Sequence, residues 1–98
     1  MKQNVGKHCM VRTQNAGVFC GTITEIESDH VVVSDARRIW YWAGAASLSQ
    51  LATTGTSNPS ACKFPATVAS VTLKDWIEII PTTEAARESI DEVKPWQQ

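Results

Sequence analysis

Two short segments that alternate apolar and polar residues, joined by turn-forming residues, are the strongest constraint on the fold of this chain. Residues 7–13 and 18–26 show the period of two that is typical of half-buried strands. Asn15 and Gly17 between them accept left-handed backbone angles and therefore predict a hairpin. Gly21 lies inside the second segment, and a glycine there indicates a bend or bulge where a sheet begins to curl.

The rest of the chain predicts further strands and two short helices. Residues 30–42 favour one bulged strand or two short ones, and residues 66–73 and 75–80 favour two more strands. Each helix is predicted from a stripe of apolar residues that faces inward and from its capping residues. The first helix has the stripe Leu48, Leu51 and Ala52, with Ser47 as N-cap and Gly55 after its end. The second has the stripe Ala86, Ile90 and Val93, with Thr82 or Thr83 as N-cap.

These elements predict an α+β fold in a single domain that spans residues 1–98. Five or six short strands form a small, strongly curled antiparallel sheet or a barrel-like fold, with one short middle helix and one C-terminal helix. A chain of 98 residues buries about two-thirds of the surface that its unfolded form exposes, so a second independent core is not expected. Because a small barrel has a filled interior, ligands are expected at its rim or between subunits.

The composition argues against several functional classes. Nine Lys and Arg against ten Asp and Glu leave a net charge of -1, which disfavours duplex DNA and membranes as partners. Cys9, Cys20 and Cys62 form no C-x-x-C pair, which disfavours a disulfide framework or zinc site and favours reduced thiols in the cytoplasm. Neither His8 nor His30 stands in a metal-ligand or catalytic spacing. We therefore expect a soluble protein that is not an enzyme and holds no metal or cofactor.

The most unusual stretch is A-R-R-I-W-Y-W, residues 36–42, in which two arginines precede three aromatic residues. In an unbroken strand, alternation would place Arg37 and Tyr41 on one face, and Arg38 with the two tryptophans on the other. In one interpretation these side chains are packing. In another, one face lines a pocket where an indole stacks on a base and a guanidinium holds a phosphate. The candidate ligand-binding residues are Arg37, Arg38, Trp40 and Trp42, followed by Tyr41 and Lys63.

The same aromatic face is also suited to an interface between subunits. Trp, Tyr and Arg are the residue types enriched at interface hot spots, so a homo-oligomer is expected. Lys63 beside Phe64 repeats the pairing of a cation with a ring on a smaller scale. Trp96 should be frayed unless it docks on the same or a neighbouring subunit.

Three segments of the chain resemble small uncharacterised proteins encoded by bacteriophages and prophages. They are V-R-T-Q-N-A-G-V-F-C-G-T-I, A-R-R-I-W-Y-W-A-G-A with the L-S-Q-L-A and G-T-S that follow it, and I-E-I-I-P-T-T-E-A-A-R-E-S-I. The resemblance covers nearly the whole chain and implies a phage origin, with the host bacterial cytoplasm as the place of action, and no particular activity. By analogy alone, it suggests the phage proteins called sponges, which sequester nucleotide signals of bacterial immunity.

The leading hypothesis is a non-enzymatic phage protein that binds and sequesters a small cyclic nucleotide-type signal, a cyclic ADP-ribose isomer or a cyclic dinucleotide, and so inhibits host defence. One alternative is a protein-interaction module that blocks a host factor through the same aromatic surface. Another is a barrel that binds single-stranded nucleic acid, which suits stacking rings but not the net charge. Hydrolysis of the signal, in place of sequestration, is a further alternative.

Overall fold

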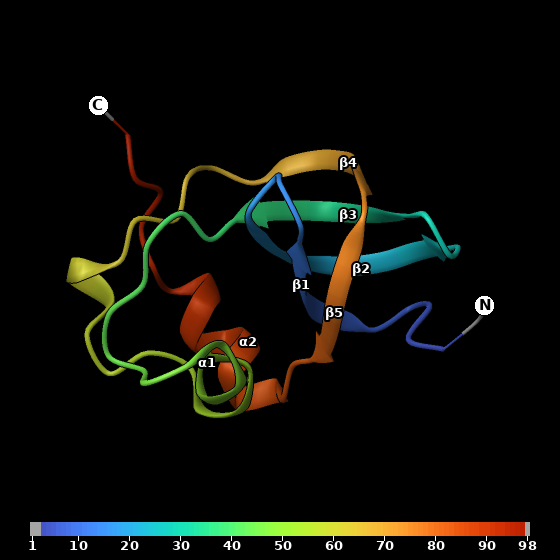
Figure 1. Ribbon diagram of the computed structural model, residues 1–98. Helices are drawn as coiled ribbons and strands as arrows, with labels where there is room; N and C mark the ends of the chain where they lie inside the picture. Colours follow the sequence, from blue (N-terminus) through green and yellow to red (C-terminus); the bar gives the residue numbers. More distant parts are fainter. Residues whose placement is uncertain (1–2, 98) are drawn as a thin grey trace.

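The computed structural model describes residues 3–97, which form a five-stranded antiparallel sheet and two helices (Figure 1). The predicted α+β class is confirmed. The strands are β1 (His8–Thr13), β2 (Val18–Ile26), β3 (His30–Arg38), β4 (Val68–Lys74) and β5 (Trp76–Pro81). The helices are α1 (Leu48–Thr54) and α2 (Glu84–Asp91), with a 3-10 turn, η1 (Pro59–Ala61), between α1 and β4.

The sheet is curled, and its two edge strands are almost continuous in the sequence. The strand order is β4-β3-β2-β1-β5, so β4 and β5 lie at opposite edges although one residue, Asp75, separates them. Asp75 has a positive φ of 57°, and its N–H donates to the Asp29 carbonyl while its own carbonyl accepts from Gln14 N–H. The chain passes directly from one edge to the other at this corner (Figure 1). β4 and β5 do not pair with each other, so the sheet is curled but not closed.

The residues from 30 to 38 form one bulged strand, which is one of the two predicted forms. The register between β2 and β3 shifts opposite Gly21, where Asp35 on β3 takes a positive φ of 48°. A Cβ atom on Gly21 would lie 2.5 Å from Val33 Cγ1 and 2.7 Å from the Ser34 carbonyl oxygen, so this close approach of β2 and β3 requires glycine. The strand ends at Arg38, and the expected continuation to Trp42 is wrong.

The middle of β1 and the first half of β2 are buried on both faces, and each face supports its own apolar cluster. Cys9 and Val11 belong to the cluster on the inner side of the curled sheet, whereas Met10 belongs to the cluster against the helices. The inner cluster consists of Cys9, Val11, Phe19, Ile23, Ile26, Val31, Val33, Ala36 and Leu73. The cluster against the helices consists of Met10, Cys20, Ile39, Leu48, Leu51, Ala52, Cys62, Phe64, Ile90 and Val93.

The helix caps follow the sequence signals. Ser47 Oγ accepts from Gln50 N–H, and Thr83 Oγ1 accepts from Ala86 N–H, each at 3.1 Å. The predicted inward stripes of both helices are buried. The chain between β3 and β4 winds past α1 and η1 along one end of the sheet, beside the segment that follows α2 (Figure 1). The side chains of the predicted site lie in this region.

Candidate functional site

Arg37 is buried and holds parts of the fold together, so its guanidinium is not available to a ligand. Its side chain is 6% exposed, and its guanidinium donates to the carbonyls of Pro65, Ile90, Phe64 and Val93. Ile90 lies in the last turn of α2 and Val93 follows that helix, so Arg37 donates to two carbonyls at the end of a helix, of which the Ile90 carbonyl also accepts from Val93 N–H. Burial lowers the pKa of Arg37 from its ordinary value. All these groups belong to the same chain, and we therefore remove Arg37 from the candidate phosphate contacts.

Arg38 is exposed and is held beside the turn between β1 and β2. Its Cζ lies 4.3 Å from the centroid of the Phe19 ring, and its Nη1 donates to the Ala16 carbonyl at 2.8 Å. The ring and the carbonyl fix the plane of the guanidinium. Within residues 3–97, the ion pairs are Arg12–Glu78, His30–Glu25 and His30–Asp29, so Arg38 carries a charge that no carboxylate neutralises.

The backbone after Arg38 turns both Trp40 and Tyr41 toward solvent. Residues 39–42 are not part of β3, and Tyr41 instead forms an isolated antiparallel bridge with Lys63. The Lys63 N–H donates to the Tyr41 carbonyl at 2.8 Å. The alternation of faces expected for an unbroken strand over residues 37–42 therefore does not apply, and Trp40 is 59% exposed and Tyr41 50% exposed.

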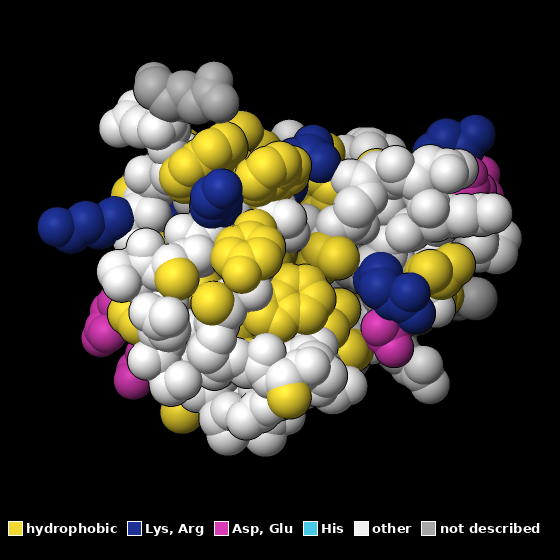
Figure 2. All heavy atoms as spheres, turned by 60° about the vertical axis from the view of Figure 1, so that its left-hand side comes forward, with side chains coloured by type: hydrophobic (Ala, Val, Ile, Leu, Met, Phe, Trp, Pro, Cys, Tyr) yellow, Lys and Arg dark blue, Asp and Glu magenta, His cyan; other side chains and the backbone are white. Residues whose placement is uncertain are grey.

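Trp96 completes a cluster of three rings around the Lys63 ammonium. The Trp40 and Trp96 rings are stacked, with centroids 5.1 Å apart and an angle of 5° between their planes. Lys63 Nζ lies 5.2 Å from the Trp40 centroid, 5.9 Å from Tyr41 and 5.6 Å from Trp96. Trp96 thus docks on its own chain. We call Trp40, Tyr41, Trp96 and Lys63 the aromatic–lysine surface. Figure 2 shows ring-shaped hydrophobic side chains gathered on one face with Lys or Arg side chains between them.

Two hollows adjoin the stacked pair: Trp40 lines one and Trp96 lines the other. The first has a volume of about 360 Å³ and is formed by the β1–β2 turn, Arg38, Ile39, Trp40 and Trp42. Trp42 is partly buried there, and its indole N–H donates to the Ala45 carbonyl. Three of the six predicted residues, Arg38, Trp40 and Trp42, therefore share one hollow. The second hollow, of about 480 Å³, is lined by Pro59, Ser60, Cys62, Glu92, Lys94, Pro95, Trp96 and Gln97.

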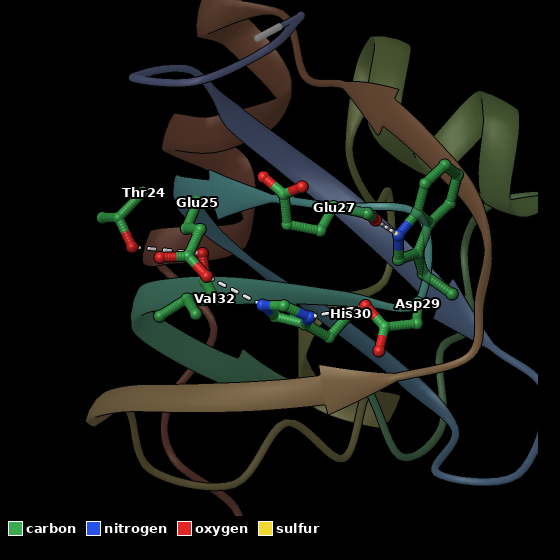
Figure 3. A network of polar contacts seen from close by, with 7 residues as sticks. Thr24, Glu25, Glu27, Asp29, His30 and Val32 are labelled. Carbon is green, nitrogen blue, oxygen red and sulfur yellow. Dashed lines mark hydrogen bonds and ion pairs between the residues drawn. The ribbon is translucent and has the colours of Figure 1, made fainter. Parts of the chain in front are cut away.

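A second polar cluster lies at the β2–β3 turn, at the other end of β3 (Figure 3). His30 contacts Glu25 Oε2 through Nε2 at 2.7 Å and Asp29 Oδ1 through Nδ1 at 2.8 Å. The hydrogen bond to Glu25, followed by that to Asp29, raises the pKa of His30, and the bond from His30 lowers the pKa of Asp29. This cluster ties the turn together. In the described part of the chain, no group of three or more His, Cys, Asp or Glu side chains is placed to hold a metal ion.

The titratable groups in the core are poorly suited to nucleophilic or acid–base roles. Burial raises the pKa of Cys9 to about 11 and that of Cys20 to about 12, so both thiols are protonated near neutral pH. Burial, assisted by the charge of Arg87, lowers the pKa of His8. His8 Nδ1 lies 2.6 Å from Thr82 Oγ1.

The sequence located part of this site and missed the rest. Trp96 and Phe19 were not among the predicted residues, although one stacks on Trp40 and the other on Arg38. Trp96 is 56 positions from Trp40 in the sequence, and no local pattern connects them. The sequence contains one indication of its role: a tryptophan so near the end of the chain is frayed unless it docks on another part of the protein.

The fold and the site together define a small α+β protein with an open, curled sheet and an exposed aromatic surface, next to two cations that form no ion pair within residues 3–97. The chain belongs to a family described as a domain of unknown function, DUF6948, whose model matches residues 6–90. This agrees with the expected membership of an uncharacterised family. Comparison with curated proteins and with solved structures finds no match in either set. Across residues 3–97, neither helix has the length and apolarity that crossing a membrane requires.

Proposed function

We propose that this protein binds and sequesters a small anionic nucleotide at the aromatic–lysine surface and the adjoining hollow. The observation that carries the proposal is the exposure of Trp40 and Tyr41 next to two cations, Lys63 and Arg38, that form no ion pair within residues 3–97. A planar ring and a phosphate are the chemical groups that such a surface complements.

The free energies that such contacts contribute are large enough to bind a small ligand. Stacking of a base on an aromatic side chain contributes about 1 to 3 kcal/mol, and a hydrogen bond to a charged group about 1.5 to 3 kcal/mol. The hollow of about 360 Å³ beside Trp40 lies within the size range of ligand pockets. Because Arg38 is already fixed by Phe19 and Ala16, little of its conformational freedom remains to be lost on binding.

Sequestration is favoured over hydrolysis by the groups near the surface. A hydrolytic reaction requires a positioned base or nucleophile. Among the described residues that line the hollow beside Trp40, none carries a carboxylate, an imidazole or a thiol, and the buried thiols of Cys9 and Cys20 are protonated. We propose that the ligand is a cyclic nucleotide-type immune signal, a cyclic dinucleotide or a cyclic ADP-ribose isomer. The setting would be a phage-infected bacterium, an assignment that rests on the family resemblance and on analogy with sponges.

Calorimetric titration with a panel of cyclic dinucleotides and cyclic ADP-ribose isomers tests the proposal. We expect heat of binding from at least one member at micromolar concentration, and a roughly 5- to 150-fold loss of affinity in Trp40→Ala, as removal of one stacking contact implies. Arg12→Ala is the matched control, because Arg12 is an exposed arginine paired with Glu78 on β5. No heat from any member at concentrations well above micromolar contradicts the proposal. Mass analysis of the nucleotide released by heat should return it unchanged.

The second candidate function is docking of a host protein on the same surface. It is favoured by the half-exposed rings of Trp40 and Tyr41, since Trp, Tyr and Arg dominate interface hot spots. Capture of one defined host protein by the unaltered chain and not by Trp40→Ala, without heat from any nucleotide, would support this candidate.

A further inference from the structure

The stacked pair of tryptophans has the geometry of a bound ligand ring. Trp96 lies parallel to Trp40, with 5° between the planes and 5.1 Å between the centroids. A base stacked on Trp40 would take this same offset, parallel arrangement. Indole is a fused five- and six-membered ring, as is purine. Trp96 therefore occupies, within its own chain, the position and the area that a purine would occupy on Trp40.

The cation above the pair strengthens the comparison. Lys63 Nζ lies between 5.2 and 5.6 Å from both stacked rings, and Tyr41 flanks it at 5.9 Å. A ligand ring in the place of Trp96 would retain the contact with Lys63. Trp40 also lines the hollow that contains Arg38, so Arg38 is a second cation next to the Trp40 ring for a phosphate of the ligand.

The contacts that hold Trp96 in place are few enough for a ligand to replace them. The described backbone anchor of Trp96 is one hydrogen bond, from its N–H to the Phe64 carbonyl at 2.9 Å. The neighbouring residues Lys94, Pro95 and Gln97 are exposed. An aromatic pair at a surface is a weak contact, comparable with or weaker than base stacking.

We infer that the ligand of this site carries a purine ring, and that this ring replaces Trp96 on the face of Trp40. The inference rests on the proposed function for the site and adds the class of base. It makes Trp96 an internal competitor: the site is open in the fraction of molecules in which Trp96 has left Trp40, and the measured affinity is lowered by that fraction.

The test compares GMP and UMP as probes for the unaltered chain, Trp96→Ala and the double variant Trp40→Ala/Trp96→Ala. Removal of the competitor should tighten GMP binding by about two- to tenfold, the range that corresponds to one lost aromatic pair. Trp96→Ala should also prefer GMP to UMP, because the larger purine covers more of the Trp40 ring. The double variant should lose the gain.

A second variant and a second measurement guard against disturbed folding. Trp96→Phe keeps a ring that covers less of Trp40, so its gain in GMP affinity should lie between those of the unaltered chain and Trp96→Ala. In the unaltered chain, nuclear Overhauser contacts between the Trp40 and Trp96 rings should weaken when GMP is added.

Each outcome decides the inference. If Trp96→Ala binds GMP no more tightly than the unaltered chain, Trp96 is part of the binding site and the inference is overturned. Equal binding of GMP and UMP by Trp96→Ala also overturns the inference, as does the absence of GMP binding to both proteins. The proposed function fails separately: if the cyclic panel does not bind but Trp96→Ala gains affinity for GMP, the purine site stands and sequestration of cyclic signals falls. If the cyclic panel binds the unaltered chain and Trp96→Ala equally, sequestration of cyclic signals stands and the replacement of Trp96 by a purine ring is overturned.

Discussion

Arg37 and Arg38 are adjacent in β3 and chemically identical, yet their guanidinium groups lie in different environments. Arg37 is buried and donates to four backbone carbonyls, whereas Arg38 is exposed between Phe19 and a solvent-facing hollow. The strand places one side chain under α2 and the next on the outside. The same residue type therefore serves the fold at one position and the proposed site at the next.

Replacement of Arg37 should destabilise the protein much more than replacement of Arg38. Arg37→Met removes the side-chain donor of the Pro65 and Val93 carbonyls, and we expect a loss of about 2 to 4 kcal/mol in the free energy of unfolding. Arg38→Met is the matched control, with an expected change below about 1 kcal/mol. Urea unfolding followed by tryptophan fluorescence measures both. Equal effects would contradict the structural role of Arg37.

The two histidines should titrate on opposite sides of the ordinary histidine pKa. Hydrogen bonds to Glu25 and Asp29 raise the pKa of His30, and burial lowers that of His8. Since the pKa of His30 is raised in the folded state, its stabilising contribution is full below the unfolded pKa of about 6.5 and is lost as the pH rises through the folded value. For Asp29 the pH dependence is opposite: because its pKa is lowered in the folded state, its stabilising contribution is present at neutral pH and is lost as the pH falls through that lowered pKa.

A proton NMR titration of the two imidazole rings measures this prediction directly. The His30 midpoint should lie above the His8 midpoint, and Glu25→Gln should lower the His30 midpoint without moving that of His8, which has no contact with Glu25. A His30 midpoint that does not respond to the substitution would contradict the assigned cause.

Among the elements, β2 and β3 depend on a single glycine where they approach most closely. Gly21 faces Val33 and the Ser34 carbonyl across a register shift, with no space for a Cβ atom. The sequence indicated the position of this bend, because a glycine inside an alternating segment has few other reasons to occur. It did not indicate which partner strand would be close.

Gly21→Ala should therefore lower the free energy of unfolding by about 1 to 3 kcal/mol through overpacking. Ser70→Ala on the exposed part of β4 is the control, with a change within about 0.5 kcal/mol. Thermal unfolding compares the two. An unchanged Gly21→Ala protein would show that the strands can move apart without loss.

At the scale of the whole molecule, the sequence predicts what depends on neighbouring residues and misses what depends on distant ones. The bounds of β2, the caps Ser47 and Thr83 and the inward stripes of the helices follow from local patterns, and the structure confirms them. The departure of Trp40 from β3 depends on the bridge between Tyr41 and Lys63, which are 22 positions apart. The burial of Arg37 likewise depends on carbonyls near residues 64 and 90, and such pairings leave no periodic signal in the sequence.

Homo-oligomerisation stays a prediction at this scale. β4 lies at one edge of the sheet and the aromatic–lysine surface is exposed, and either feature can contribute to an interface between copies. Sedimentation velocity over a range of concentrations should give a mass above that of one chain. The mass of a single chain at every concentration would contradict the prediction.

The most direct test of the account follows the indole N–H signals of the four tryptophans by NMR while a cyclic dinucleotide or a cyclic ADP-ribose isomer is added. Trp40 and Trp96 form the stacked pair and Trp42 lines the adjoining hollow, whereas the Trp76 N–H is bonded to the Glu27 carbonyl at the far turn. The account predicts large, saturable shifts for Trp40 and Trp96, a smaller one for Trp42 and none for Trp76. Shifts at Trp76 alone, or no shift at any tryptophan with any member of the panel, would contradict it.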